Sequence, residues 1–222
     1  RVTASAVLLT LLAACGGDPT GPGTGGGGTP PVQPPPPPPP PPPPAPTDTL
    51  PTLRREFRGV WIATVSNIDW PSRAGLPVDQ QQRELIGLLD RAQATGLNAV
   101  ILHVRPAADA VYRSSLEPWG SMLTGRQGED PGWDPLEFAI REAHRRGLEL
   151  HAWFNPFRAG NAPDTLRLAS THAWNQARDL VRVYGFTIPG RQTAQLWLDP
   201  AEPRVHDRSI AVILDVTRRY DV

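Results

Sequence analysis

Three short apolar runs of the sequence each end in a set of polar or aromatic residues. Carboxylates, amides and guanidinium groups make directed hydrogen bonds to hydroxyls, and the apolar faces of sugar rings stack on indoles such as that of Trp119. These residue types therefore favour a polyhydroxylated ligand. Arg105 and Arg158 could also hold a carboxylate or a phosphate. The three sets are Asn67, Asp69 and Trp70; His103, Arg105, Asp109 and Tyr112; and Asn155 and Arg158.

Asp109 is the one candidate for catalysis, and a structural explanation of it is preferred. Glycoside hydrolysis usually needs two carboxylates, about 5–5.5 Å apart for retention or 6.5–9.5 Å apart for inversion. Asp69 and Asp109 follow neighbouring strands, so such a pair is permitted. Asp109 also stands four residues after Arg105, which could keep it ionised or could simply be its structural partner.

Several other kinds of chemistry find no support in the sequence. The net charge is zero and no basic stripe occurs, so nucleic acid is not an expected partner. No Gly-x-Ser-x-Gly or Gly-x-Gly-x-x-Gly is present, which disfavours a serine nucleophile and a dinucleotide cofactor. His103 and His151 form no metal-binding motif, so neither a metal nor another cofactor is predicted.

The elements that would position these residues alternate between strand and helix. Strands are predicted at 57–65, 97–104 and 148–154, from their apolar and β-branched composition. A helix over 79–94 has capping-box spacing at Asp79 and Gln82 and ends at Gly96, and a second runs from the capping box Asp134-Pro-Leu-Glu137 to Gly147. This order predicts a parallel sheet covered by helices, whose strands deliver polar residues to one edge.

Beyond the third strand the pattern predicts a helix at about 173–184, an extended piece at 195–198 and a helix at about 203–220. The expected fold is α/β: about three β/α units from the N-terminal part of a TIM (β/α)8 barrel. An open doubly wound sheet is the alternative. The long connection from Arg105 to Trp133 is typical of a functional or a disordered loop, and we expect Trp119 and Trp133 to be exposed there.

Residues 1–53 differ from the domain at 54–222. An apolar run at 6–14 is too short to span a bilayer, and Leu12-Ala-Ala-Cys15-Gly16 resembles the bacterial lipoprotein signal, so residues 1–15 are predicted to be a signal peptide with lipidation at Cys15. An ordinary secretory signal is the alternative. Residues 16–53 form a Gly/Pro-rich linker with eleven consecutive prolines, which as polyproline II would span roughly 34 Å. A spacer is preferred over a ligand for proline-binding modules, and the predicted location is the bacterial cell envelope, with a membrane anchor.

A family resemblance covers nearly all of residues 55–222. The chain resembles the bacterial glycosyl-hydrolase-like family 10 domain. The resemblance implies a TIM-barrel enzyme of the cell envelope, often a lipoprotein, with some members acting on peptidoglycan glycan strands, including strands stripped of peptide. The blocks that carry it are Arg55-Glu-Phe-Arg-Gly-Val-Trp-Ile-Ala-Thr-Val-Ser-Asn-Ile-Asp-Trp-Pro71, His103-Val-Arg-Pro-Ala-Ala-Asp-Ala-Val-Tyr112, Glu117-Pro-Trp, Leu123-Thr-Gly, Asp134-Pro-Leu and Glu149-Leu-His-Ala-Trp-Phe-Asn-Pro-Phe-Arg158.

Two departures limit what the resemblance implies about residues. The family pattern Trp-Leu-Asn-Pro-Gly reads Trp197-Leu-Asp-Pro-Ala201 here, and the expected acidic cluster of the next strand would lie beyond Val222. The catalytic residues are therefore unknown and the chain is expected to be an inactive fragment. The substrate-side residues that can be carried over are Arg105, Asp109, Asn155 and Arg158.

Three functions follow as hypotheses: a glycoside hydrolase acting on a bacterial polysaccharide, a non-catalytic glycan-binding lipoprotein, or a structural envelope protein. Paired carboxylates and cleavage products would distinguish the first from the second, and glycan affinity would distinguish both from the third. The sequence indicates no oligomeric state.

Overall fold

The computed structural model describes residues 56–161, 165 and 167–222. The predicted signal peptide, Cys15 and the proline-rich linker lie outside the described residues. No helix within the described part is long and apolar enough to cross a membrane.

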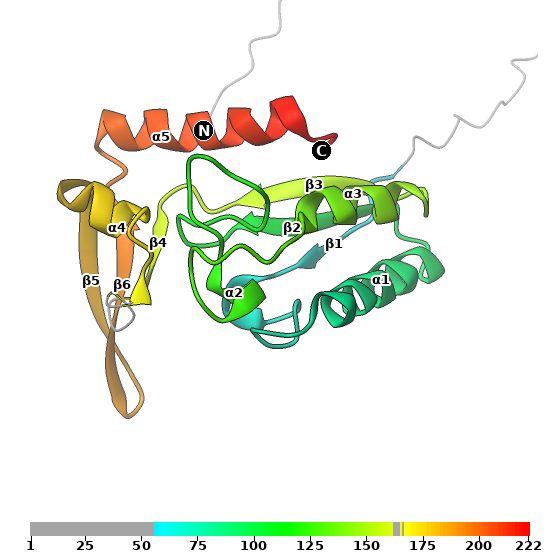
Figure 1. Ribbon diagram of the computed structural model, residues 1–222, viewed down its shortest axis with the longest axis horizontal. Coiled ribbons are helices and arrows are strands. Elements are labelled where there is room, and N and C mark those ends of the chain that lie inside the picture. The colour runs from blue at the N-terminus through cyan, green and yellow to red at the C-terminus, as the bar shows by residue number, and fades with distance from the viewer. Residues whose placement is uncertain (1–55, 162–164, 166) are drawn as a thin grey trace, which may run out of the picture. The chain divides into compact units, whose positions relative to one another are not determined.

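A three-stranded parallel sheet organises the domain (Figure 1). Its strands are β1 (Gly59–Ile62), β2 (Ala99–Arg105) and β3 (Glu149–Phe154), in the order β1-β2-β3. Gly59 stands opposite Ala99, and Ala99 opposite Glu149, so all three strands start level and their carboxyl ends meet at one edge. The three predicted strands and their parallel arrangement are confirmed, although β1 is shorter than the predicted 57–65.

Helices α1 (Val78–Ala94) and α3 (Pro135–His144) pack side by side over one face of this sheet. Each is followed by a glycine in the left-handed region, Gly96 with φ 75° and Gly147 with φ 68°, as the sequence predicts. Alternate strand residues face these helices and form the main core with them. That core includes Ile62, Val100, Leu102, Val104 and Leu150 from the strands and Leu85, Leu89, Ala92, Leu136, Ala139 and Ala143 from the helices.

The other face of the sheet carries aromatic side chains. Trp61 is 58% exposed and meets Trp153 edge to face, with ring centroids 4.9 Å apart. Trp153 in turn stacks on His103, whose centroid lies 3.6 Å away. Trp153 is half-buried between Trp61 and His103.

The two predicted helix starts have different outcomes. The capping prediction for α1 is wrong: Pro77 precedes the helix, no side chain caps it, and Asp79 pairs with Arg83 at 2.6 Å instead. Asp134 does cap α3, since its Oδ1 accepts hydrogen bonds from the amides of Leu136 and Glu137. In α1, Asp79 lies inside the first turn and pairs with Arg83 instead of capping the helix. In α3, Pro135 occupies the first helical position, so Asp134 stands at the N-cap.

Replacing Asp134 should destabilise more than the helix it caps. Its Oδ2 also accepts from the Arg113 amide at 3.0 Å and from the Tyr220 hydroxyl at 2.6 Å. We expect Asp134→Ala to lower the free energy of unfolding by about 2 kcal/mol, measured by urea denaturation of the full-length protein. Glu129→Ala, in the same loop and exposed, is the control and should change it by less than about 0.5 kcal/mol.

A second sheet corrects the prediction for the region after β3. It contains β4 (Arg158–Asn161), β6 (Arg191–Leu198) and β5 (Val181–Ile188), in that order and antiparallel. The predicted helix at 173–184 is wrong, because helix α4 covers only Ala173–Gln176 and the 3-10 turn η3 (Arg178–Leu180) leads directly into β5. The β-branched and aromatic residues of β5 pair with β6 over the turn at Gly190, where φ is 77°, and this pairing outweighs helix propensity. The predicted extended piece at 195–198 is confirmed as the end of β6.

Helix α5 (Pro203–Arg219) matches its prediction. Its buried side chains are Val205, Ser209, Val212 and Val216. It lies against the connection that follows β2, where Arg208 and Arg219 donate to the carbonyls of Leu116 and Arg113. That long connection contains the short helix α2 (Ser121–Thr124).

Candidate functional site

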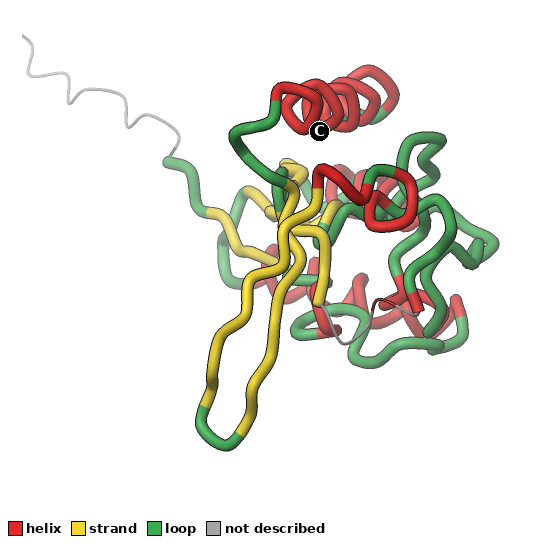
Figure 2. Tube along the Cα trace, turned by 90° about the vertical axis from the view of Figure 1, so that its left-hand side faces the viewer, coloured by secondary structure: helices red, strands yellow, loops and turns green. Residues whose placement is uncertain are grey.

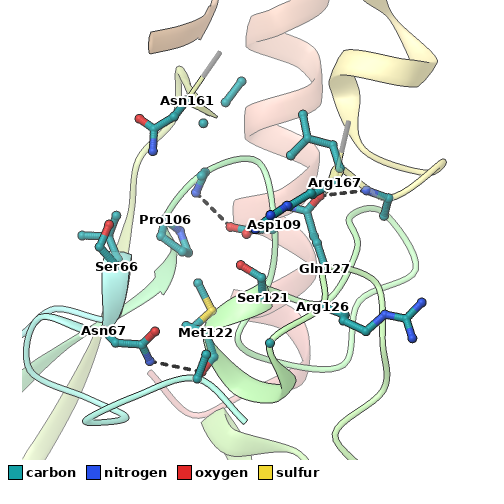
Figure 3. Close-up of a pocket in the computed structure, with 18 of the residues that line it drawn as sticks. Ser66, Asn67, Pro106, Asp109, Ser121, Met122, Arg126, Gln127, Asn161 and Arg167 are labelled. Carbon is teal, nitrogen blue, oxygen red and sulfur yellow. Dashed lines mark hydrogen bonds between the residues drawn. The ribbon is translucent and has the colours of Figure 1, made fainter. Parts of the chain in front are cut away.

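A cleft of about 740 Å³ opens at the carboxyl ends of the parallel strands. The segment after β1 (with η1, Val65–Asn67), the segment after β2, the α2 region and β4 all contribute to it (Figure 3). Its lining residues are Val65, Ser66, Asn67, Ala74, Pro106, Ala107, Asp109, Ser121, Met122, Gly125, Arg126, Gln127, Arg158, Ala159, Gly160, Asn161, Arg167, Leu168 and Ala169. The strand-end residues Asn67, Asp109 and Arg158, which are far apart in the sequence, therefore share one cleft.

Backbone strain is concentrated at this cleft. Ser66, Asn67 and Ala108 each have φ 53° and are the non-glycine residues of the described chain with positive φ. The Asn67 side chain donates to the carbonyls of Pro71 and Met122, which ties the segment after β1 to α2. Such conformations cost about 1–3 kcal/mol each and cluster at binding and catalytic sites. The strain therefore supports a functional role for this edge of the sheet.

Asp109 is the one carboxylate among the described residues that line the cleft. It is almost fully buried; Oδ1 accepts from the Ala107 amide at 2.9 Å and Oδ2 from Gln127 Nε2 at 3.1 Å. Gln127 is itself fixed, because its Oε1 accepts from the Ala169 amide. Burial raises the pKa of Asp109 above the ordinary value, which favours the protonated acid over the carboxylate.

His172 supports the same turn, and sequence reasoning missed it. Its Nδ1 accepts from the Trp174 amide at 3.1 Å, so its Nε2 carries the proton and donates to the Ala107 carbonyl at 3.0 Å. Asp109 therefore binds the N–H of Ala107, and His172 binds its carbonyl. Burial lowers the pKa of His172, which keeps the ring neutral. No motif marks this residue, which is found only through its position at the start of α4.

Arg105, predicted to contact substrate, instead lies inside the protein. Its side chain is 1% exposed; Nε and Nη2 donate to Glu117 Oε2 and Oε1 at 2.7 and 2.6 Å, and Nη1 donates to the Asn155 carbonyl. Arg105 is thus a positioning residue beneath the cleft, and the expected pairing with Asp109 is wrong. Glu117 carried no role in the sequence, although it stands in the block Glu117-Pro-Trp.

Three other residues predicted for the site, Asn155, Asp69 and Trp119, lie outside the lining of the cleft. Asn155 bridges two strand ends, since Nδ2 donates to the Pro106 carbonyl and Oδ1 accepts from Trp153 Nε1, each at 3.0 Å. Asp69 Oδ2 accepts from the Ala63 amide and does not line the cleft, so the Asp69–Asp109 pair is not assembled there. Trp119 is half-buried against the main core and lies outside the cleft lining, contrary to the expected exposure.

The charge of the cleft is positive. Among the described residues that line it, Arg126, Arg158 and Arg167 are cationic and Asp109 is the single acid. The Nε of Arg158 is buried and has no hydrogen-bond partner among the described residues. Guanidinium groups bind carboxylates and phosphates in bidentate geometry, so the cleft suits an anionic ligand. In the described ranges, no group of three His, Cys, Asp or Glu side chains is placed to hold a metal ion.

Comparison with known proteins identifies the family of the chain. A family model described as glycosyl hydrolase-like 10 matches residues 56–222. The chain belongs to the glycosyl hydrolase-like 10 family. In its described residues, this member of the family contains three β/α units and the antiparallel sheet β4-β6-β5.

Two curated relatives of this glycosyl hydrolase-like 10 chain are named as glycosyl hydrolases. Glycosyl hydrolase YngK of Bacillus subtilis (strain 168) is 47% identical over 169 residues, which are 76% of this chain and 32% of the relative. Glycosyl hydrolase DigH of Escherichia coli (strain K12) is 37% identical over 193 residues, 80% of this chain and 42% of the relative. The chain thus spans about a third to two fifths of the length of these relatives.

Among solved structures, the noncanonic maltogenic α-amylase AmyB of Thermotoga neapolitana aligns with a TM-score of 0.43 at 12% identity, over 75% of this chain and 37% of that one.

Proposed function

We propose that this chain supplies the substrate-binding part of a cell-envelope glycoside hydrolase that acts on bacterial glycan, including peptidoglycan strands stripped of their peptides. The observation that carries the proposal is the cleft at the carboxyl ends of the strands, whose lining includes arginines and polar residues. Family membership supports hydrolysis of glycosyl bonds as the reaction class.

The charge of the cleft favours a stripped strand over a neutral polysaccharide. A glycan strand that has lost its peptides carries free carboxylates along its length, and each can pair with a guanidinium group. Arg126, Arg158 and Arg167, which carry such groups, are all among the residues that line the cleft. Amide side chains such as Gln127 and Asn161 offer donors and acceptors for hydroxyls.

Asp109 is the candidate acid for this reaction. Its raised pKa suits a residue that must hold a proton near neutral pH and donate it to a leaving group. Among the described residues that line the cleft, Asp109 is the single acid, and a mechanism with two carboxylates needs a second one in addition to it.

The direct test is to incubate the full-length protein with purified peptide-free glycan strands, intact peptidoglycan and neutral polysaccharides, and to follow reducing ends and fragment sizes. Fragments from the peptide-free strands are the expected result. The absence of fragments from every polysaccharide would contradict the proposed reaction.

A non-catalytic glycan-binding lipoprotein is the second candidate function. The same single carboxylate favours it, because binding needs the arginines and amides but no acid pair. It predicts that the full-length protein sediments with glycan and releases no fragments.

The proposed attachment to the cell envelope rests on Cys15, which directly follows the apolar run at 6–14. Lipidation of its thiol would anchor the protein, and the eleven prolines that follow would hold the domain away from the membrane. The full-length protein should partition into the detergent phase, and Cys15→Ser should move it to the aqueous phase. Equal partitioning of both forms would contradict the anchor.

Neutralising Arg158 should weaken binding of acidic glycan specifically. We expect Arg158→Gln to raise the Kd for peptide-free strands about tenfold, measured by calorimetry, with little change for a neutral polysaccharide. Arg91→Gln, the same charge change at an exposed position in the last turn of α1, is the matched control. Equal losses in both variants would mean that net charge rather than the cleft decides affinity.

A further inference from the structure

The hairpin formed by β5 and β6 projects from the rest of the domain as a two-stranded arm (Figure 2). Strand β4 pairs with β6 only between Gln195 and Trp197, so the outer part of the arm has no third strand among the described residues. A two-stranded ribbon is marginally stable in water by itself. A binding partner on the arm would therefore add to its stability.

One face of this arm carries a row of rings, which we call the hairpin platform. Residues directly opposite in an antiparallel ladder share a face, so the pairs Tyr184–Gln195 and Phe186–Thr193 lie on the same side as Trp197. Tyr184 is 70% exposed and Phe186 41% exposed, while Trp197 is half-buried at the base. Exposed rings gathered in this way mark an interaction surface rather than a scatter of single apolar residues.

The chemistry of the hairpin platform suits a chain of sugar rings. Each exposed ring stands opposite a hydrogen-bonding side chain, Tyr184 opposite Gln195 and Phe186 opposite Thr193. Trp197 Nε1 donates to Gln195 Oε1 at 3.2 Å, which fixes the indole along the same row. Aromatic faces accept the apolar faces of sugars while amides and hydroxyls bond their hydroxyl groups.

The platform is continuous with the cleft. Trp197 stands opposite Arg158 of β4, so the two side chains lie on the same face of the second sheet, and Arg158 lines the cleft. From Trp197 to the level of Phe186 the ladder covers about 14 Å at the usual rise per strand residue. A strand that leaves the cleft beside Arg158 thus meets the platform next.

We propose that the hairpin platform is a secondary glycan-binding surface that holds long strands outside the cleft. The proposal rests on the proposed function and deepens it, because it makes polymer length a determinant of affinity. Short oligosaccharides occupy the cleft alone and gain nothing from the platform.

The test compares long and short ligands on the full-length protein. The double variant Tyr184→Ala/Phe186→Ala should raise the Kd for long peptide-free peptidoglycan strands about tenfold and leave the Kd for short oligosaccharides prepared from them unchanged. The matched control is Val183→Ala/Thr187→Ala, two exposed residues of the same strand on the opposite face, which should change neither value. Unfolding curves that coincide for all three proteins would show that the arm still folds.

Three outcomes would overturn the proposal. If the double variant binds long strands as tightly as the wild type, the platform is not a glycan surface, although the proposed function stands. If light scattering shows that the wild type self-associates and the double variant does not, the platform joins two copies of the chain. If the wild type binds neither long strands nor short oligosaccharides, the platform proposal fails together with the proposed function.

Discussion

Replacing Glu117 by glutamine should lower the free energy of unfolding of the full-length protein by about 3–5 kcal/mol. The substitution leaves the Arg105 guanidinium buried, 1% exposed, with no carboxylate to balance it. Two charge-assisted hydrogen bonds, at 2.6 and 2.7 Å, are weakened at once. Chemical denaturation followed by tryptophan fluorescence measures the change.

Two comparisons make this prediction specific. Asp79→Asn breaks an ion pair of equal length, 2.6 Å to Arg83, but at an exposed site on α1 where water screens the charges, and should change the stability far less than Glu117→Gln does. The double variant Arg105→Met/Glu117→Leu removes both buried charges and should recover much of the stability lost in Glu117→Gln. If Glu117→Gln is no worse than Asp79→Asn, the buried pair does not support the cleft.

The Arg105–Glu117 pair also affects the cleft, because Arg105 has a third hydrogen bond, to the residue that follows β3. Nη1 bonds the carbonyl of Asn155, whose side chain bonds the carbonyl of Pro106. The ends of β2 and β3 are therefore joined through Arg105. A loosened pair should weaken glycan binding together with stability, whereas Arg158→Gln should weaken binding alone.

The sequence predicts the parallel sheet well because its signals are local. Apolar runs of strand length, Asp134 before Pro135, and Gly147 after α3 each act within a few residues of the element that they define. The meeting of the strand ends follows from parallel order alone. For this reason Asn67, Asp109 and Arg158 could be expected at one edge before their contacts were known.

What the sequence could not predict depends on contacts between distant segments. Arg105 stands at a strand end like a ligand-binding residue, but a loop returns Glu117 to it and buries both charges. His172 reaches the Ala107 carbonyl across 65 residues. The region 173–184 has apolar residues that fit a helix, and only pairing with β6 makes most of it a turn and a strand.

Acidification should destabilise the protein through His103. This side chain is fully buried, stacks on Trp153, and neither ring nitrogen has a partner among the described residues. Burial, helped by the nearby Arg158 cation, lowers the pKa of His103 to about 4 from its ordinary value of 6.5. Between these two pKa values, the His103 ring is therefore protonated in the unfolded chain and neutral in the folded one.

The sign of the effect follows from this difference in proton binding. Above pH 6.5 the His103 ring is neutral in both the folded and the unfolded state, so it causes no loss of stability. Between pH 6.5 and about 4 the unfolded state binds more protons, so the free energy of unfolding falls as the pH falls. The loss from this one residue should approach about 2–3 kcal/mol at pH 4.

Replacing His103 by phenylalanine separates the contribution of His103 to the pH dependence of stability from the contributions of the carboxylates and of His172. We expect His103→Phe to lose about 2–3 kcal/mol less than the wild type between pH 7 and pH 4, in denaturant titrations of the full-length protein at matched ionic strength. His144→Phe, at a partly exposed position at the end of α3, should leave the pH dependence close to that of the wild type. Parallel stability–pH curves for His103→Phe and the wild type would show that the ring takes up a proton as readily in the folded chain as in the unfolded one, which its burial against Trp153 forbids.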